Sequence, residues 1–571
     1  MGVPRFYKYL SRKYPSVITT KLPSNAASLA IDMNGIFHTI GSKVYGLDSS
    51  YTPQEKAKIQ RRARKTLDNE FLVGVVTKLM ELVRMVKPRE ILIMAVDGVV
   101  PLSKIQQQRQ RRYRAAMEAE SDSIFDRNAF TPGTELMTRL DTYINLWIIA
   151  SQAYLPNTVI YSSYQVPGEG EHKIMDIYRT NRLRGRKGVH VLYGLDADLI
   201  LLALAAPLQH IQLMRESEFR IDGLKIAPLR NLIPVPINDF IIIMALMGND
   251  FLPKHPGLKD MEYGMEQIID AYKEAKITSF TNEDKTVNLG ELLKYFKQLC
   301  ESETAFLEHE RERNPKLKFP SKLFSESMEN GKVNYETYRA YWYGKEAGEE
   351  TTTISEEMVP EMCQDYIRGL CWIYRYYTKG HNSVTNQYVY RFLHAPLFCD
   401  VVEAFDNFSY DPAKPEDEPE IGIPTQLLSV MPPKSFPLLP LELSSNLEQE
   451  NMLADNFPYE IEVDMDGVDE SYQGVSLIYP ACFDKINIFV EMIEFTPRHE
   501  KSLAIKTTHN TYIRNAGQMA EIRAKFDIRD KLKILRDEFK GKARPMKKVR
   551  PKSNIPKADV KEWSMKKEIS F

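Results

Sequence analysis

Short apolar runs alternate with longer helical patterns over the first 250 residues of this 571-residue chain. Runs rich in β-branched residues predict four strands, at 28–31, 90–96, 157–162 and 190–195. Residues 67–87 have the apolar period of an amphipathic helix, and residues 237–247 predict a buried helix that stops at Gly248. Because strands alternate with helices, the pattern predicts an α/β fold with an open, mostly parallel sheet flanked by helices on both faces.

The pattern changes after residue 260. Residues 261–335 are polar and helical, which predicts a connector between two regions. Residues 336–495 are rich in aromatic side chains, and we expect a second, mainly helical region that packs on the α/β core. The last part, 496–571, predicts a basic amphipathic helix at 518–539 followed by a cationic tail. The sequence therefore predicts four parts: a domain over 1–260, a connector over 261–335, a second region over 336–495 and a basic C-terminal part over 496–571.

Composition limits the class of protein. The chain has no run of about 18 apolar residues that could cross a bilayer, so we expect no membrane partner. Its five cysteines contain no CxxC pair, and we therefore expect neither a disulfide framework nor a zinc ribbon. The N-terminus has no secretory signal. We expect an intracellular protein, cytoplasmic in preference to nuclear, although the basic tail leaves a nuclear location open.

Charge is segregated along the chain although the formal net charge is only −1. Residues 101–114 carry five cationic side chains and no acid, and residues 540–557 carry eight and no acid. Residues 447–470 carry nine acids and no base. Each run alone fits a solvated face, but the segregation can also create local fields that attract polyanions. The tail is open to several roles: a nuclear import signal, an arm that grips RNA, or a contact for protein partners.

Carboxylates follow several of the predicted strands. They are Asp32, Asp97, Glu169, Glu171, Asp196, Asp198 and Asp250. One aspartate at a strand end is usually a helix N-cap, and we expect Asp250 to cap the helix that follows it. The carboxyl ends of parallel strands meet at one edge of a sheet, however, so the set as a whole predicts an acidic cluster at that edge.

The stretch PGEGEH, residues 167–172, places two glutamates one glycine apart. Unpaired carboxylates this close repel one another, and divalent cations relieve that repulsion. Oxygen ligands without cysteine or several histidines favour Mg²⁺ or Mn²⁺. Two such ions about 4 Å apart would hold the attacking and leaving oxygens of a phosphodiester. The glycines let the backbone fold tightly enough for both glutamates to reach the ions, so the sequence predicts a metal-dependent nuclease.

A basic stripe follows Asp97. Pro101 suits the start of a helix, and the residues on one face of that helix are Lys104, Gln108, Arg111 and Arg112. Arg109 and Arg114 are expected to point elsewhere. Three cations and an amide donor on one stripe form a clamp for phosphate, and the alternative is a solvated basic face. We favour the clamp because the stripe follows a predicted metal ligand within a few residues.

Longer motifs along the chain identify a family. MGVPRFYKYL, IDMNGIFH, AVDGVVPLSKIQQQRQRRYRAA, TPGTELM, PGEGEHKIM, YGLDADLI and MGNDFLP resemble, in order, the first conserved region of the XRN 5′→3′ exoribonucleases. YRAYWYG, LHAP, IPTQLLSVMPP and NFPYEIEVDMDG are similar, more loosely, to the second conserved region. The resemblance covers roughly 1–260 and 335–490. It implies a nuclease core like that of PIN domains and flap endonucleases, with the second region completing the active-site pocket.

The resemblance also implies an activity and residue roles. It implies processive removal of nucleotides from single-stranded RNA with a 5′ monophosphate, using Mg²⁺ or Mn²⁺ held by the carboxylates named above. The basic stripe would bind the 5′ phosphate, and His38 would stack on the terminal base. The family has a tryptophan-rich stretch before its AP dipeptide, where this chain reads NQYVYRFLHAP, so Tyr388 or Tyr390 is expected to serve as the stacking partner of His38. The long C-terminal domains of the large cytoplasmic members are missing, so we expect a short form.

Two alternatives belong to other classes. A flap-endonuclease-like 5′ DNA nuclease would share the carboxylates, but the second conserved region and the KxxxQxxRR stripe argue against it. An inactive RNA-binding scaffold would not need all of these acids. The sequence therefore favours an exoribonuclease, and it leaves the RNA targets and the oligomeric state open.

Overall fold

The computed structural model describes residues 5–119, 124–180, 188–216, 220–346, 358–406, 408–447 and 451–513. Residues Gly2–Tyr512 form one compact unit, so the first three predicted segments share a single unit. The predicted helix at 518–539 and the cationic tail lie outside the described residues. The boundaries between the predicted domains stay a prediction.

An eight-stranded sheet is the centre of this unit, with the strand order β1-β7-β6-β5-β2-β3-β4-β12 among the described residues. From β6 to β4 all neighbouring strands are parallel, whereas β7 is antiparallel to both β6 and β1. The strands are β1 Ile18–Thr19, β2 Ser28–Asp32, β3 Ile91–Ala95, β4 Thr158–Ser162, β5 His190–Tyr193, β6 Ile211–Glu216, β7 Ile221–Lys225 and β12 Asn510–Ile513.

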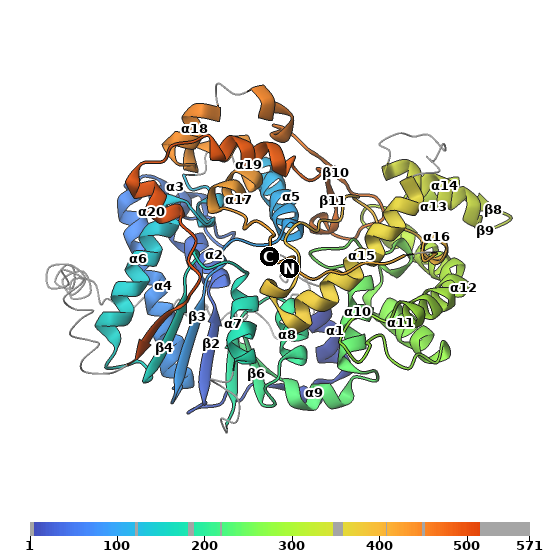
Figure 1. Cartoon of the computed structure of the whole chain (residues 1–571), viewed down its shortest axis with the longest axis horizontal. Coiled ribbons are helices and arrows are strands. Elements are labelled where there is room, and N and C mark those ends of the chain that lie inside the picture. Colours follow the sequence, from blue (N-terminus) through green and yellow to red (C-terminus); the bar gives the residue numbers. More distant parts are fainter. Residues whose placement is uncertain are drawn as a thin grey trace. The chain divides into compact units, whose positions relative to one another are not determined.

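Helices cover both faces of the sheet because its strands are apolar on both sides (Figure 1). Alternate residues of β2 point to opposite faces, so that Leu29 and Ile31 join one buried core and Ala30 joins the other. The first core contains α2 Asn34–Val44, α4 Arg64–Val86 and α6 Glu135–Ser151. The second contains α1 Phe6–Lys13, α7 Gly170–Arg179, α8 Asp198–Ala205, α9 Ile226–Leu232 and α10 Ile237–Leu246.

The second core continues without a break into the aromatic part of the chain. The helices there are α11 Met261–Glu274, α12 Leu289–Arg313, α13 Leu323–Glu326, α14 Tyr335–Glu346, α15 Met358–Lys379 and α16 Phe398–Glu403, with a small hairpin of β8 Met328–Glu329 and β9 Lys332–Val333. Trp372 and Tyr376 of α15 are fully buried in the same core as Ile200 of α8 and Ile243 of α10. The predicted aromatic helical region therefore packs on the α/β core, as expected.

A third group of elements contacts α5 Leu102–Glu118 through α17 Ile423–Val430 and β11 Val475–Leu477. It also contains α18 Leu441–Leu447, α19 Phe483–Glu491, α20 Pro497–Leu503 and β10 Glu462–Asp464, which forms a hairpin with β11. Gln106 of α5 donates to the Ile478 carbonyl, and Arg109 donates to the Ser429 carbonyl at 2.9 Å. α3 Pro53–Gln60 is exposed, and a capping box of Thr52 and Glu55 begins it.

The four predicted strands and both predicted helices of the first 250 residues are confirmed, and the helix after residue 236 ends at Leu246. Two expectations need correction. Asp250 caps no helix, because the next helical turn, Pro256–Leu258, is capped by the His255 side chain. The structure also contains one disulfide, Cys300–Cys399, between α12 and α16. These cysteines are 99 residues apart, so no local spacing could reveal the pair.

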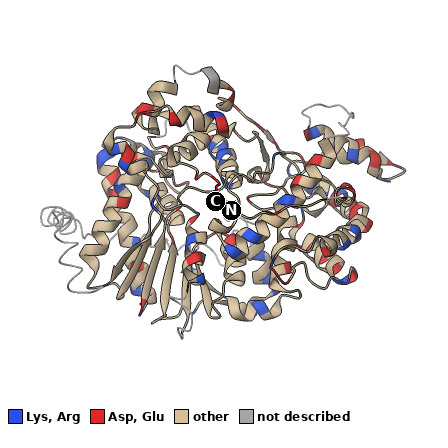
Figure 2. Ribbon diagram, viewed as in Figure 1, with Lys and Arg blue, Asp and Glu red and all other residues tan. Residues whose placement is uncertain are grey.

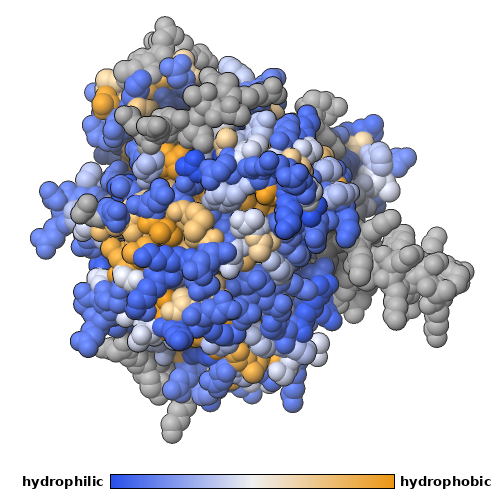
Figure 3. Space-filling view, turned by 90° about the vertical axis from the view of Figure 1, so that its right-hand side faces the viewer, coloured by the Kyte–Doolittle hydropathy of each residue, from blue (hydrophilic) through white to orange (hydrophobic). Residues whose placement is uncertain are grey.

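On the face drawn in Figure 3 hydrophilic side chains predominate, with apolar patches between them. Among the described residues no single helix is both long and apolar enough to cross a membrane, and only α9 and α10 taken together, bent by 81°, reach that length and composition.

Candidate active site

Parallel strands bring the predicted carboxylates to one edge of the sheet. Asp32 is the last residue of β2 and lies opposite Ala95, the last residue of β3. Asp97 follows Ala95 by two residues. On its other side β2 pairs in parallel with β5, which ends at Tyr193 shortly before Asp196. Neighbouring strands in register end at the same level, so these three aspartates lie at the same edge.

The glycines of the PGEGEH stretch fold the glutamate loop against these aspartates. Gly168 has φ +103°, a conformation that glycine adopts without strain. A methyl group at Gly170 would lie 2.7 Å from Asp32 Oδ1, so only glycine fits so close to that carboxylate. The Gly170 N–H donates to Asp97 Oδ1 at 2.7 Å. Glu169 and Glu171 therefore flank a glycine whose N–H binds Asp97 and whose missing side chain leaves room for Asp32.

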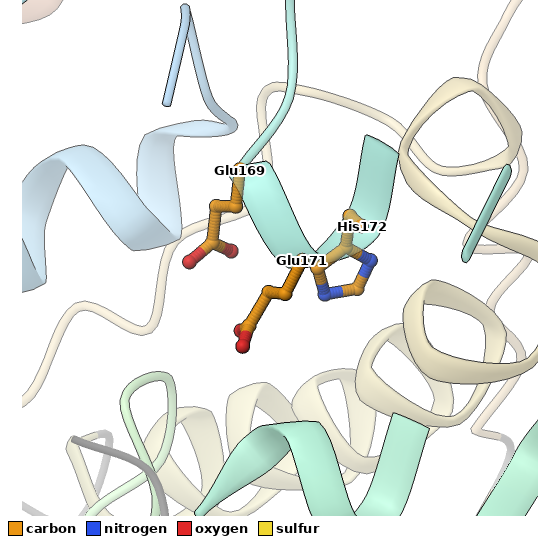
Figure 4. A group of neighbouring side chains, drawn as sticks. All are labelled: Glu169, Glu171 and His172. Atoms are coloured by element: carbon orange, nitrogen blue, oxygen red, sulfur yellow. The ribbon is translucent and has the colours of Figure 1, made fainter. Parts of the chain in front are cut away.

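Figure 4 shows the two glutamates at the start of α7 with their carboxylates on one side of the helix and the His172 ring beside Glu171. Ligand atoms of these three buried side chains all lie within 4.8 Å of one another. Lys104 joins Asp250 to this group, since its Nζ lies 2.5 Å from Glu169 Oε2 and 2.6 Å from Asp250 Oδ2.

Electrostatic coupling shows that the set forms one cluster. Burial, together with the Asp97 and Asp196 charges, raises the pKa of Asp32 well above its ordinary value. Burial and Asp198 raise the pKa of Glu171 in the same way. Burial and Asp250 raise the pKa of Asp198 to about 7. These three carboxylates thus feel the charge of their neighbours, whereas, despite burial, the contact with Lys104 lowers the pKa of Asp250. Contacts and mutual charge effects together place all seven predicted carboxylates in one cluster.

The donor set fits divalent cations. Within the described part of the chain, Glu171 Oε2 and Asp198 Oδ1 are buried and have no hydrogen-bond partner. Buried carboxylate oxygens without partners are costly unless a cation binds them. All seven acids offer oxygen, the ligand that Mg²⁺, Mn²⁺ and Ca²⁺ prefer in proteins. The cluster is therefore a candidate metal centre.

Three residues that the sequence did not single out support the acidic cluster. Asn34 donates to Asp97 Oδ2 at 2.7 Å and accepts from the Asp97 N–H at 3.1 Å. Lys173 is buried, and its Nζ donates to the Val96 and Ser163 carbonyls, which ties together the ends of β3 and β4. Tyr376 of α15 donates to Glu169 Oε1 at 2.8 Å.

The basic stripe runs along α5, where Figure 2 marks several lysines and arginines. Lys104 is buried among the carboxylates, Gln108 and Arg112 are half-buried, and Arg111 is exposed. Arg112 donates to Gln108 Oε1 at 3.4 Å, and its buried Nη1 has no partner among the described residues. Burial and the adjacent Arg111 charge lower the pKa of Arg112 to about 9. An anion between these guanidinium groups would relieve their repulsion.

Arg109 and Arg114 point away from the stripe, as predicted. Arg109 is buried and binds the Ser429 and Asn456 carbonyls. Arg114 binds the Gly474 and Ser471 carbonyls.

His38 lies near the outer end of the stripe. Its ring packs edge-on against Phe130 with centroids 5.2 Å apart. Burial and the charge of Arg111 lower the pKa of His38 to about 4, so its imidazole is neutral near pH 7. A neutral ring beside the arginines suits the predicted stacking role, which stays a prediction.

The expected stacking partners of His38 are placed differently. Tyr388 is buried, its ring packs 5.6 Å from Trp372, and its hydroxyl donates to the Asp365 carbonyl. Tyr390 is also buried and donates to the His394 carbonyl. Both rings are therefore largely buried, and the role of Tyr388 or Tyr390 as stacking partner of His38 stays a prediction.

Family models match most of the chain. A model described as XRN 5′-3′ exonuclease N-terminus matches residues 1–217, and one described as Xrn1 helical domain matches residues 234–341 and 325–493. The chain belongs to the XRN 5′-3′ exonuclease family. In this XRN chain the first match contains six of the seven clustered acids, and the second contains Asp250 and Tyr376.

Relatives of this XRN chain include 5′-3′ exoribonuclease 1 of Homo sapiens, 27% identical over 84% of the chain and 33% of that protein. 5′-3′ exoribonuclease 1 of Saccharomyces cerevisiae is 25% identical over 84% of the chain and 42% of that protein. The 5′-3′ exoribonuclease 2 homolog of Drosophila melanogaster is 24% identical over 84% of the chain and 69% of that protein. The chain thus spans less than half the length of the first two relatives.

Solved structures with partial likeness to this XRN chain include the catalytic core of Rad2 in complex with DNA substrate. Its TM-score is 0.33 and its sequence identity 12%, over 71% of this chain and 93% of that one. Flap endonuclease-1 from Methanococcus jannaschii has a TM-score of 0.30 and 13% identity, over 51% of this chain and 92% of that one.

Proposed function

We propose that this protein is a metal-dependent 5′→3′ exoribonuclease that degrades single-stranded RNA with a 5′ monophosphate. One observation carries the proposal: Lys104 of the basic stripe contacts Glu169 and Asp250 of the acidic cluster directly. A site for cations and a site for an anion therefore adjoin. Phosphodiester cleavage at a strand end needs both, because the terminal phosphate must be held while the next phosphate reacts. The named relatives have the same activity in their names.

The acidic cluster would hold Mg²⁺ or Mn²⁺, which polarise the scissile phosphate and activate water when bound. Asp32, Asp97 and Glu169 lie on the sheet side of the site, where Gly170 fixes their spacing. Glu171 and Asp198 supply the oxygens that have no partner in the described structure. The neutral amide of Asn34 fixes the orientation of Asp97 without adding charge.

The basic stripe would hold the terminal 5′ phosphate. Arg112 has a free buried N–H, and Arg111 offers an exposed guanidinium beside it. A terminal monophosphate carries a second negative charge that an internal diester lacks, so two adjacent arginines favour it. A pocket of fixed size would exclude a cap or a triphosphate.

The reaction is a hydrolysis. The oxygen of water bonds to the phosphorus between the first two nucleotides, the bond from that phosphorus to O3′ breaks, and O3′ takes up a proton. A nucleoside 5′-monophosphate leaves, and the shortened RNA keeps the phosphate as its new 5′ end. Since that end is again a ligand for the stripe, binding after each step favours processive degradation.

The test uses RNA labelled along its length and bearing a 5′ monophosphate, a 5′ hydroxyl or a 5′ triphosphate, with and without Mg²⁺ or Mn²⁺. We expect mononucleotides from the first products onward, only with metal, and fastest from the monophosphate. Early release of short oligomers would contradict exonucleolytic cleavage. Cleavage of flap DNA without degradation of the RNA would instead identify a DNA nuclease.

A further inference from the structure

Helix α15 brings an aromatic cluster to the acidic site. The Tyr376 ring stacks on the His172 ring with centroids 3.8 Å apart and 27° between the planes. It also stacks on Trp372 at 4.7 Å and 22°. The Phe251 ring, next to Asp250, packs edge-on against Tyr376 at 5.5 Å. Tyr376 is therefore enclosed on several sides by rings, and none of its surface is exposed.

The Tyr376 hydroxyl donates to Glu169 Oε1 at 2.8 Å across 207 residues of sequence. The second oxygen of Glu169, Oε2, contacts Lys104. Glu169 thus has two donors, one neutral and one cationic.

The two donors differ in how many carboxylates they serve. Lys104 divides its ammonium group between Glu169 and Asp250. Tyr376 has few rotatable bonds, and its stacking on His172 and Trp372 fixes the place of its hydroxyl. The backbone on either side of Glu169 is held by hydrogen bonds of Gly168 and Gly170, which leaves the carboxylate to be oriented by its own donors. The Tyr376 hydroxyl, held by ring stacking, donates to Glu169 Oε1 and so fixes that oxygen.

We infer that Tyr376 is a positioning residue that orients Glu169 for binding a divalent cation, an inference that rests on the proposed function of the acidic cluster. Hydrogen-bond partners of metal ligands set ligand orientation, and their loss typically lowers metal affinity or activity about 10- to 100-fold. The aromatic region would then complete the active site through this hydroxyl.

The first test is Tyr376→Phe in the full chain, which keeps the ring stacking and removes only the hydroxyl. Mn²⁺ alone is the probe, and its binding is followed by the electron paramagnetic resonance of the free ion. We expect the Mn²⁺ affinity to fall about tenfold or more. With RNA, kcat at low Mg²⁺ should fall while KM for RNA stays the same, and higher Mg²⁺ should restore kcat.

The matched control is Tyr366→Phe, also on α15 and also buried, whose hydroxyl donates to the Pro253 carbonyl at 3.5 Å. It should leave Mn²⁺ affinity unchanged. Equal losses of Mn²⁺ affinity from the two phenylalanine variants would overturn the inference, because a general packing defect would then explain both. Unchanged affinity in Tyr376→Phe would overturn it as well.

A double-mutant cycle tests the route through Glu169. In a Glu169→Gln background, Tyr376→Phe should cause no further loss of Mn²⁺ affinity, whereas an undiminished loss would overturn the inference. The Mn²⁺ measurement contains no RNA. Normal Mn²⁺ binding with the expected loss in Tyr376→Phe, but no RNA degradation, would therefore contradict the proposed function and leave the positioning role intact.

Discussion

The acidic edge of the sheet and the aromatic helix α15 meet at Glu169 but contribute opposite properties. The edge gathers mutually repelling carboxylates, of which Glu171 Oε2 has no partner in the described structure. The aromatic helix contributes a tightly packed cluster around Tyr376, with one neutral donor aimed at the edge. The difference shows how such a site can be stable. The sheet edge contains carboxylates that destabilise the fold when they are buried and ionised, and the aromatic helix holds one of them in place by a hydrogen bond.

The largest expected effect comes from removing an acid of the edge. Glu171→Gln should lower the rate of RNA hydrolysis about a thousandfold, which corresponds to ~4 kcal/mol of transition-state stabilisation. The same change should raise the thermal stability of the metal-free protein, because burial and Asp198 disfavour the ionised Glu171. Hydrolysis rates and melting temperatures check this, with the exposed Glu460→Gln as control. An unchanged rate of RNA hydrolysis in Glu171→Gln would show that Glu171 is not a metal ligand in the reaction.

A smaller loss is expected from the basic stripe. Arg111→Ala should slow degradation of 5′-monophosphate RNA about 10- to 100-fold, because it removes charge-assisted hydrogen bonds to the terminal phosphate. Degradation of 5′-hydroxyl RNA should change little. Arg114→Ala, on the same helix but bound to the Gly474 carbonyl, is the matched control. Equal losses on both RNA ends would count against the phosphate clamp.

The two regions should also differ in how pH affects stability. The folded-state pKa of Asp198 is raised to about 7, so between pH 4 and about 7 the native state binds more protons than the unfolded state. Stability of the metal-free protein should therefore fall as pH rises through this window, by at most ~1.4 kcal/mol per pH unit for one such group.

Chemical denaturation at several pH values measures this slope. Asp198→Asn should flatten it, whereas Tyr388→Phe in the aromatic region should leave it unchanged. Mg²⁺ or Mn²⁺ should stabilise the protein more at pH 7 than at pH 5, since protons compete with the metal for the carboxylates. If the free energy of unfolding depends on pH equally in Asp198→Asn and in the unchanged protein, Asp198 does not have the raised pKa assigned to it.

The smallest effect concerns base stacking. His38→Ala should slow each step about fivefold and change RNA affinity less, because we expect its stacking to lie at the lower end of the about 1–3 kcal/mol that one stacked base contributes. With the pKa of His38 lowered to about 4 by burial and Arg111, its loss should not alter the pH dependence of the rate between pH 6 and 8. A changed profile in that range would show that His38 acts through its proton.

The acidic edge could be predicted from sequence because parallel strands bring local motifs to a common edge. Asp32 and Asp97 each follow an apolar run directly, and that pattern alone places them together. The stripe on α5 could be predicted for a similar reason, since helical spacing fixes which residues share a face.

The supporting residues could not be predicted in this way. Tyr376 looks in sequence like any core tyrosine, and its contact with Glu169 depends on how α15 packs against α7 and α8. The stacking role of Tyr388, which the family resemblance implied, stays a prediction, and the structure buries this ring and binds its hydroxyl to the Asp365 carbonyl. The cellular location and the role of the basic tail stay predictions.

The central claim is that the acidic edge binds divalent cations between the ends of β2, β3 and β5 and the starts of α7 and α8. Anomalous diffraction from crystals of the full chain soaked in Mn²⁺ tests it most directly. We predict manganese peaks bound by Glu171 and Asp198, with the phosphate of a bound 5′-monophosphate nucleotide on Arg111 and Arg112. Manganese found only elsewhere on the protein would contradict the account.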